Sequence, residues 1–244
     1  MYRALEGHAA GSGSTVKERF LYPLTYEPGS SWGRIPLSPL SSTDGMLIKR
    51  AGYGVGLDWT GKLIEKLTGE SLEDYMRKNI WEPLGINRIT FFPSRHPEMK
   101  VAQLTSRDQE TGRLIPNEEP FLNEHSTEEF GGHGAYADLS DYVKILHSIL
   151  CDDEVLLRKE TAARMFQPQL TKESKMGLQD VMSMPEASAM LVGDFPRKID
   201  YDWGIGGLLV QQDNVRRRKK GTLIWSGMPH VFWVCLSVHC TLLR

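Results

Sequence analysis

Helical and strand-like patterns are segregated along this 244-residue chain, and the segregation limits the folds that it can adopt. In several stretches between residues 58 and 166, apolar residues recur at spacings of three and four, the period of an amphipathic helix. Apolar stretches at 204–211, 221–227 and 230–238 are short and separated by turn signals, which is typical of antiparallel strands. Helices followed by strands predict an α+β fold, with a helical region plus an antiparallel sheet.

Capping residues, glycines and prolines set the expected helix boundaries. One helix starts near Asp58 and ends at Gly69, and a second starts at Ser71 and ends before Pro83. The first places on one face Trp59, Leu63, Ile64 and Leu67. The second places on one face Leu72, Tyr75, Met76 and Ile80.

A third long helix is expected after the glycine turn at residues 131–134, with Asp138 as its cap. Its predicted buried stripe consists of Leu139, Tyr142, Val143, Leu146, Ile149 and Leu150. Thr15 and Glu18 form a capping box that opens a short helix through Phe20. A further short helix is expected at 159–166 and a short strand at 87–94. Residues 95–130 are polar and loop-like, and 168–200 carry no clear period.

Composition argues against several kinds of partner. The net charge of −2 gives no electrostatic reason to expect nucleic acid. The basic run at 216–220 lies between two strand-like stretches and is interpreted as a solvated hairpin loop. No apolar stretch approaches the roughly 18 residues of a membrane span, and the N-terminus lacks a signal-peptide core. We therefore predict a cytoplasmic protein without membrane or nucleic-acid partners and leave its oligomeric state open.

The cysteines and histidines do not suggest a metal centre. Cys151, Cys235 and Cys240 lack metal-ligand spacing, and His, Cys, Asp and Glu residues do not cluster at such spacings. A small, odd number of cysteines fits a reducing compartment better than a disulfide framework. The sequence therefore predicts no metal and no cofactor.

Three segments together resemble one protein family. They are "EPGSSW" with the later "YGVGLDWTGKLIEKLTGESLEDYMRKNIWEPLGI", then "GGHGAYADLSDYVKIL", then "RRRKKGTLIWSGMPHVFW". The chain resembles the serine β-lactamase-like hydrolases, which include class C β-lactamases, related esterases and the fungal lovastatin-type transesterases. The resemblance covers roughly residues 15–233 and implies a β-lactamase/transpeptidase-like fold.

The same resemblance implies the site residues. Tyr53 matches the loop tyrosine that moves protons together with a lysine, and Trp225, Ser226 and Gly227 match the strand motif that lines the site. A serine hydroxyl is a poor nucleophile until a base takes its proton, and a tyrosine near a lysine can have its pKa lowered enough to be that base. A backbone N–H on an edge strand can stabilise the tetrahedral oxyanion.

Structural roles are the alternative for these residues. Tyr53 can be a packed aromatic beside Trp32 and Trp59. Trp225 can be a core residue, which does not exclude that it also lines a pocket. The flanking resemblance favours the functional interpretation of Tyr53.

The chain departs from the family pattern in four places: the nucleophile motif, an insert, the C-terminal tail and the residues after the tyrosine. The family's Ser-x-x-Lys nucleophile motif lies far upstream of the tyrosine, whereas the one literal match here, at residues 14–17, fits a helix start better and is rejected. Residues 1–14 are expected to be loose, 34–52 an unstructured insert and 234–244 an aberrant tail. We therefore expect one partial domain over 1–244, incomplete at both ends and lacking the nucleophile segment.

The predicted function is that of a serine esterase or transesterase in secondary metabolism. It would act on a small-molecule acyl ester or thioester through an acyl-serine intermediate. Gly54-Val55 after the tyrosine, in place of the β-lactamase Tyr-x-Asn, argues against penicillin turnover. Two alternatives stay open: a catalytically inactive truncated relative or defective gene product with at most a binding role, and an α+β domain that shares only the scaffold.

Overall fold

The computed structural model divides the chain into two compact units, and each is described by itself. Unit 1 comprises residues 1–23 and 55–145, and unit 2 comprises residues 24–54 and 146–244. The residues that the structure describes are 13–21, 23, 27, 54–108, 110–117, 125–192, 199–213, 218–227 and 231–235. The prediction of a single domain over 1–244 stays a prediction.

Several predicted segments lie outside this described part of the chain. They are Tyr53, the whole of the expected insert at 34–52, and nearly all of 1–14 and 234–244. The described residues contain no helix that is both long and apolar enough to cross a membrane.

Unit 1 begins with the predicted capping box and helix α2 (Val16–Phe20). The Thr15 hydroxyl accepts a hydrogen bond from the Glu18 N–H at 3.1 Å, and the Glu18 carboxylate accepts one from the Thr15 N–H at 3.3 Å. Both ends of the box satisfy backbone groups that the helix itself cannot satisfy. The helix buries Val16 fully and Arg19 almost fully.

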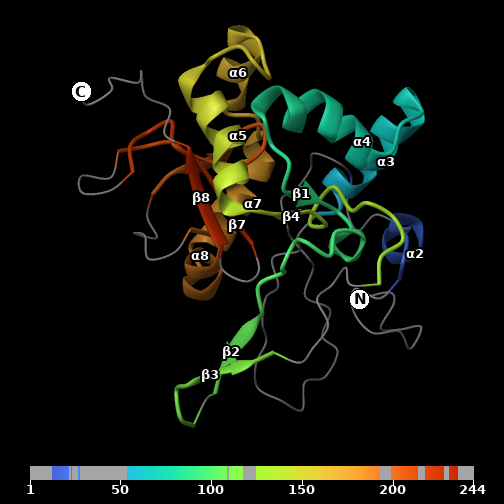
Figure 1. The fold of residues 1–244 in the computed structure, drawn as a ribbon. Coiled ribbons are helices and arrows are strands. Elements are labelled where there is room, and N and C mark those ends of the chain that lie inside the picture. The colour runs from blue at the N-terminus through green and yellow to red at the C-terminus, as the bar shows by residue number, and fades with distance from the viewer. Residues whose placement is uncertain are drawn as a thin grey trace, which may run out of the picture. The chain divides into compact units, whose positions relative to one another are not determined.

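Helices α3 (Gly56–Thr68) and α4 (Leu72–Met76) occupy the two predicted positions (Figure 1). Gly69 ends α3 in the left-handed conformation at φ 75°, and the Ser71 side chain caps α4 by accepting from the Asp74 N–H. Beyond α4 the chain continues through a π-helical turn, η1 (Arg77–Trp81), and a 3-10 turn, η2 (Glu82–Leu84). These boundaries agree with the glycine, serine and proline signals.

The apolar faces of two long helices are more exposed than their periodicity indicates. In α3, Leu63 is 53% and Leu67 is 75% exposed, and the fully buried positions are Asp58 and Gly61. In α5 (Leu139–Cys151) the predicted buried stripe is wrong at Leu139 and Val143, which are exposed. Buried positions of α5 are instead occupied by polar side chains that make hydrogen bonds. Asp141, for example, accepts hydrogen bonds from the backbone N–H groups of residues 87 and 88.

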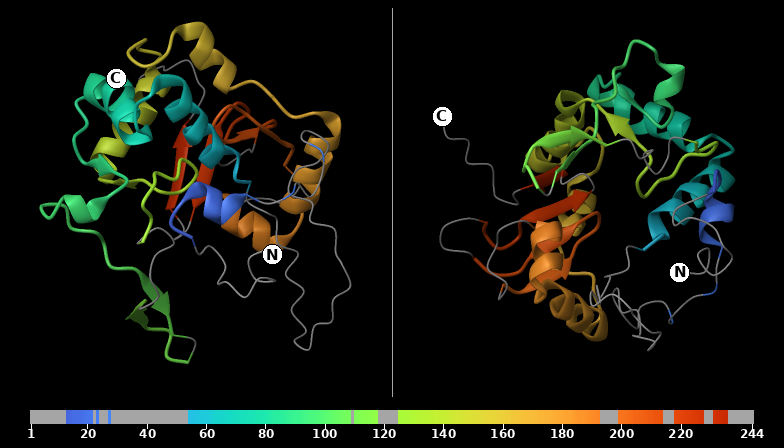
Figure 2. Two further views of the ribbon diagram at one scale, coloured as in Figure 1. Left: turned by 90° about the vertical axis from the view of Figure 1, so that its right-hand side faces the viewer. Right: turned by 90° about the horizontal axis from the view of Figure 1, so that it is seen from below.

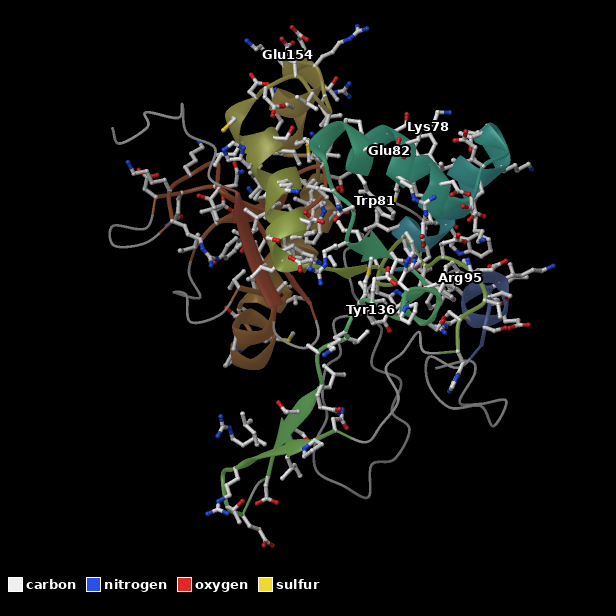
Figure 3. All side chains as sticks on the ribbon, viewed as in Figure 1. Lys78, Trp81, Glu82, Arg95, Tyr136 and Glu154 are labelled. Carbon is white, nitrogen blue, oxygen red and sulfur yellow. The ribbon has the colours of Figure 1, made fainter. Side chains whose placement is uncertain are left out.

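Aromatic and aliphatic side chains of α4, η1 and the following strand form the core of unit 1. Trp81, which is labelled in Figure 3, belongs to this core. The buried members are Leu72, Trp81, Ile86, Ile89, Phe91 and Phe92. Strand β1 (Ile89–Thr90) pairs antiparallel with β4 (Tyr136–Ala137).

Residues 95–130 contain structure that the sequence does not reveal. A 3-10 turn, η3 (Pro93–Arg95), leads to an antiparallel hairpin of β2 (Thr105–Arg107) and β3 (Leu114–Pro116). All six strand residues of this hairpin are exposed, so no alternation of buried and exposed residues could have indicated it.

Unit 2 contains a four-stranded antiparallel sheet in the order β5-β6-β7-β8. The strands are β5 (Tyr201–Trp203), β6 (Leu208–Val210), β7 (Leu223–Gly227) and β8 (Val231–Cys235). The three predicted strands correspond to β6, β7 and β8, and β5 is additional. The α+β prediction, with a helical region plus an antiparallel sheet, is confirmed.

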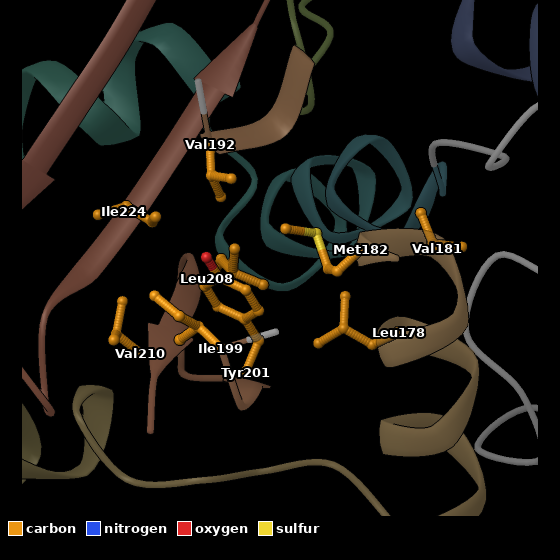
Figure 4. Close-up of a cluster of buried hydrophobic side chains, with 9 residues drawn as sticks. All are labelled: Leu178, Val181, Met182, Val192, Ile199, Tyr201, Leu208, Val210 and Ile224. Atoms are coloured by element: carbon orange, nitrogen blue, oxygen red, sulfur yellow. The ribbon is translucent and has the colours of Figure 1, made fainter. Parts of the chain in front are cut away.

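Helices cover both faces of this sheet (Figure 2). On one face, α7 (Lys172–Met182) and α8 (Pro185–Val192) contribute to a buried cluster, drawn in Figure 4. Its members are Leu178, Val181, Met182, Val192, Ile199, Tyr201, Leu208, Val210 and Ile224. On the other face, Leu209 and Leu223 pack against residues of α5 and α6 (Lys159–Met165), as alternation along the strands requires.

Helix α5 belongs to both units. Its first residues, through Ile145, lie in unit 1, and its last residues lie in unit 2. Ile145 packs against the unit 1 core, whereas Ile149 and Leu150 pack against the sheet of unit 2.

Candidate active site

The predicted strand motif lies at the end of β7. Ser226 is 6% exposed, Trp225 is half-buried and Gly227 is exposed. β7 is not the edge strand that we expected, because it lies between β6 and β8. In the register of the sheet, β6 pairs with Leu223 and Ile224, and β8 pairs along the whole of β7.

A second tryptophan, not recognised in the sequence, contacts this motif. The rings of Trp203 and Trp225 have centroids 4.7 Å apart and planes at 73°, an edge-to-face arrangement. This is a favoured geometry for aromatic pairs. Trp203 therefore restrains the Trp225 indole beside the end of β7.

A buried carboxylate fixes the backbone on which Trp203 stands. Asp202 is 3% exposed, and its Oδ1 accepts hydrogen bonds from the N–H groups of Gln169, Leu170 and Trp203 at 3.2, 3.2 and 2.8 Å. Lys175 Nζ lies 3.7 Å from its other oxygen. Because three donors and a cation surround it, the carboxylate joins β5 to the chain that leads into α7.

The rejected Ser-x-x-Lys match has a structural role. The Ser14 hydroxyl donates to Glu18 Oε2 at 3.0 Å, and the Ser14 N–H donates to the same atom at 2.9 Å. Ser14 also precedes α2, whereas Lys17 is an exposed residue inside it. The Ser14 proton is therefore directed to a carboxylate at the helix start rather than to Lys17.

Tyr53 itself lies outside the described residues, but the helix that follows it is described. α3 begins at Gly56, and Val55 at its N-cap provides no side-chain hydrogen bond to the first turn. The start of this helix is therefore held by other contacts, which come from the glycine turn at 131–134.

This glycine turn approaches α3 too closely for side chains. A Cβ atom on Gly131 would lie 2.7 Å from the Leu57 carbonyl oxygen, and one on Gly132 would lie 2.7 Å from Asp58 Oδ2. Both distances are shorter than real Cβ contacts. The turn is thus a packing requirement of the α3 start.

Three ionisable residues meet at this turn. Asp58 is 1% exposed, and its Oδ1 accepts from the Gly132 N–H at 3.0 Å and lies 3.5 Å from His133 Nδ1. On the other side of the ring, His133 Nε2 lies 3.3 Å from Arg19 Nη1. Burial lowers the pKa of His133, the Asp58 carboxylate raises it, and the Arg19 guanidinium lowers it, with a net lowering. Sequence reasoning missed this cluster, because its members are far apart in the chain.

The described part of the chain has no group of three or more His, Cys, Asp and Glu side chains that could hold a metal ion.

Comparison with known proteins identifies the family. Residues 51–230 match the family model described as Beta-lactamase. This match covers more than half of the chain, so the chain belongs to the beta-lactamase family.

Curated relatives are fungal acyltransferases and esterases. Acyltransferase mokF of Monascus pilosus is 32% identical over 227 residues, which are 91% of this chain and 50% of that protein. Monacolin J acid methylbutanoyltransferase of Aspergillus terreus is 32% identical over 224 residues, 89% of this chain and 49% of the relative. Lovastatin esterase of Penicillium rubens is 31% identical over 222 residues, 89% of this chain and 50% of the relative.

A solved structure supports the same family and confirms the predicted β-lactamase/transpeptidase-like fold. The LovD6 mutant of simvastatin synthase from Aspergillus terreus superposes with a TM-score of 0.70 at 34% identity, over 75% of this chain and 47% of that one. The chain thus spans about half the length of the relatives it matches.

Proposed function

We propose that this chain carries the proton-transfer tyrosine and the substrate-facing strand of a serine acyltransferase or esterase. The observation that carries the proposal is the end of β7, where Trp225, Ser226 and Gly227 follow one another and Trp225 packs edge-to-face on Trp203. Relatives at 31–32% identity that are named as acyltransferases and an esterase support the same chemistry. The proposed setting is secondary metabolism in the cytoplasm.

The proposed reaction has two steps through an acyl-serine. In the first, Tyr53 takes the proton of a serine hydroxyl, the serine oxygen attacks the acyl carbonyl, and the alcohol or thiol of the donor leaves with the proton that Tyr53 returns to it. In the second, water or an acceptor alcohol gives its proton to Tyr53 and attacks the acyl-serine carbonyl. The serine oxygen then leaves, takes the proton back from Tyr53, and the acid or the new ester is released. A backbone N–H at the end of β7 stabilises the negative oxygen of each tetrahedral intermediate.

The proposed substrate is a small-molecule acyl ester or thioester. Trp203 and Trp225 pack against the core of unit 2 and stay partly exposed. We propose their exposed parts as an apolar wall beside the strand end, which suits a hydrocarbon acyl chain or a hydrophobic acceptor better than a charged one. No metal or cofactor is part of this proposal.

Labelling and turnover test the proposal. The 244-residue protein is incubated with a fluorophosphonate probe, and separately with an acyl thioester and an alcohol acceptor. If the probe labels a serine, Tyr53→Phe is expected to lower turnover by at least 100-fold, within the range of general acid–base catalysis, whereas Tyr75→Phe on α4 is the matched control. Mass spectrometry of digested peptides locates any labelled serine.

A binding-only role is the second candidate, and the hydrogen bonds of Ser14 favour it. The serine of the one Ser-x-x-Lys match donates to Glu18 at 3.0 Å, so this chain does not present that serine as a nucleophile. If the probe labels no serine, and a non-hydrolysable acyl thioether still binds the protein but not its Trp225→Ala variant, the binding role replaces the catalytic one.

A further inference from the structure

Trp203 stands on the first strand of the sheet in unit 2. In the order β5-β6-β7-β8, its strand β5 pairs with β6 alone among the described strands. Along the outer side of β5, the Gln169 N–H donates to the Trp203 carbonyl at 2.9 Å. Because β5 has three residues and lies at the edge of the sheet, it needs further contacts to hold a large side chain in one place.

The buried carboxylate of Asp202 provides these contacts. Its Oδ1 accepts from the Trp203 N–H and also from the N–H groups of Gln169 and Leu170, which run beside the strand. Lys175 Nζ lies 3.7 Å from its Oδ2, so a cation faces the buried charge. Hydrogen bonds to a carboxylate are stronger than those between neutral groups. Asp202 therefore fixes the backbone of Trp203 to the chain that leads into α7.

The indole of Trp203 reaches across β6 to Trp225. In the register of the sheet, Trp203 lies opposite Leu208, and Leu208 lies opposite Ile224, the residue before Trp225. Both indoles pack against the buried cluster drawn in Figure 4 and stay partly exposed. Since their ring centres are 4.7 Å apart, their exposed parts adjoin one another at the end of β7.

The spacing of the two rings determines which acyl groups can reach Trp203. In the proposed function, the acyl group lies at the strand motif to which Trp225 belongs, and the Trp203 ring centre lies 4.7 Å from that of Trp225. A hydrocarbon chain crosses this distance in roughly three to four C–C bonds, each ~1.5 Å long. Short acyl groups therefore contact Trp225 alone, whereas acyl groups of about five carbons or more also contact Trp203.

We propose that Trp203 is a specificity-determining residue that favours longer hydrocarbon acyl groups, and that Asp202 is the positioning residue that holds Trp203 in place. The use of this surface in acyl transfer rests on the proposed function, whereas the support of Trp203 by Asp202 does not. Neither residue touches the reacting carbonyl. A fully buried methylene group strengthens binding about fourfold, and a wall covers one side of a chain, so each further methylene group should strengthen binding about two- to fourfold.

Binding of unreactive thioethers tests the role of Trp203. The 244-residue protein, labelled with 5-fluorotryptophan, is titrated with the S-ethyl, S-butyl and S-hexyl thioethers of 2-mercaptoethanol, and ¹⁹F NMR gives the Kd of each. We expect hexyl to bind more tightly than butyl by about two- to fourfold per methylene group. Trp203→Ala should remove most of this preference and leave the affinity for the ethyl thioether within about twofold, less than one buried methylene group contributes. Trp59→Ala is the matched control, because Trp59 on α3 is also partly exposed.

The same ¹⁹F signals test the role of Asp202. The chain has six tryptophans, and Trp203→Leu and Trp225→Ala each remove one signal and so identify it. Asp202→Ala should shift the signals of both indoles and reduce the preference for hexyl over butyl. Asp202→Asn keeps an oxygen that can accept from the same N–H groups, so its changes should be smaller. Asp213→Asn should change nothing, because Asp213 also accepts from a backbone N–H, that of Lys220 at 2.8 Å, but is exposed.

Each outcome decides one part of the inference. A hexyl preference that survives in Trp203→Ala, or no binding of any thioether to the unsubstituted protein, overturns the role of Trp203. If Trp203→Ala does not fold, Trp203→Leu decides in the same way. A folded Asp202→Ala protein with unchanged indole signals overturns the role of Asp202, and Asp202→Asn decides if Asp202→Ala does not fold.

Failure of the proposed function gives a different result. If the fluorophosphonate probe labels no serine while the hexyl preference still depends on Trp203, catalysis is contradicted and the selective surface is supported. If the probe labels a serine and the preference does not depend on Trp203, the proposed function stands and the inference is overturned.

Discussion

Among the described glycines of unit 2, Gly204 leaves the least room for a side chain. It follows Trp203 and begins the turn between β5 and β6, with its N–H donating to the Gly207 carbonyl at 2.8 Å. A Cβ atom there would lie 2.2 Å from the Met165 carbonyl oxygen and 2.9 Å from Leu223 Cδ1. Met165 ends α6, so a methyl group would push this helix end away from the sheet.

The size of the effect follows from these contacts. Ordinary van der Waals contact of a Cβ atom starts at 3.4 Å, so the backbone must separate by about 1 Å, and overpacking of this kind costs about 1–3 kcal/mol. The same movement weakens the hydrogen bond from the Ile205 N–H to the Met165 carbonyl, now 3.1 Å, which contributes about 1 kcal/mol. Gly204→Ala should therefore lower the free energy of unfolding by about 2–4 kcal/mol.

Urea unfolding measures this difference. Near-ultraviolet circular dichroism reports on the packed Trp203–Trp225 pair, and far-ultraviolet circular dichroism reports on the helices. Gly56→Ala is the control, because a Cβ atom at Gly56 meets nothing within 4 Å, and alanine at a helical position stabilises by up to about 1 kcal/mol. The reasoning is refuted if Gly204→Ala unfolds at the same urea concentration as the unsubstituted protein.

Three further predictions concern other contacts. The pKa of His133 is lowered in the folded protein, so below about pH 6.5 the unfolded chain binds more protons than the folded one. Stability should therefore fall as the pH decreases from there toward the folded-state pKa. Melting temperatures measured across pH 5–8 should show this slope, and His133→Gln should reduce it. Ser71→Ala removes the cap that binds the Asp74 N–H and should cost about 1 kcal/mol in urea unfolding, with Ser106→Ala on the exposed hairpin unchanged. Trp203→Leu should abolish the near-ultraviolet signal of the aromatic pair and raise the KM for acyl donors at least threefold; an unchanged KM would mean that Trp203 does not influence the proposed site.

Local signals predicted the helix boundaries well. The capping box at Thr15 and Glu18, the serine cap at Ser71 and the left-handed Gly69 all occur as expected. Each depends on hydrogen bonds or backbone angles within a few residues, so the sequence alone determines it. The strands β6 to β8 were predictable for a similar reason, since short apolar runs between turn residues are typical of β-strands.

Features that depend on distant residues were not predictable. Helix α7 buries Ser174 and Gly177 beside its aliphatic residues, so its apolar period is weak and residues 168–200 show no pattern. The exposure of Leu63 and Leu67 in α3 depends on what packs around the helix, which periodicity does not report.

The candidate site shows the same division. Trp225, Ser226 and Gly227 lie together because they are consecutive on one strand. Trp203 lies on β5 and Trp225 on β7, and both strands pair with β6. Their contact therefore depends on the order of the strands in the sheet, which local sequence does not indicate. The partly buried contact between Arg19 and His133 joins residues 114 positions apart, and no local pattern indicates such a contact.

Helix α5 determines how this protein can be divided. Its 13 residues are split between the two compact units after Ile145, so seven (139–145) belong to one and six (146–151) to the other. A helix of six or seven residues is too short to persist alone in water. A cut after Ile145 would leave two helix pieces that fray, so α5 is expected to be inherited and expressed as one segment.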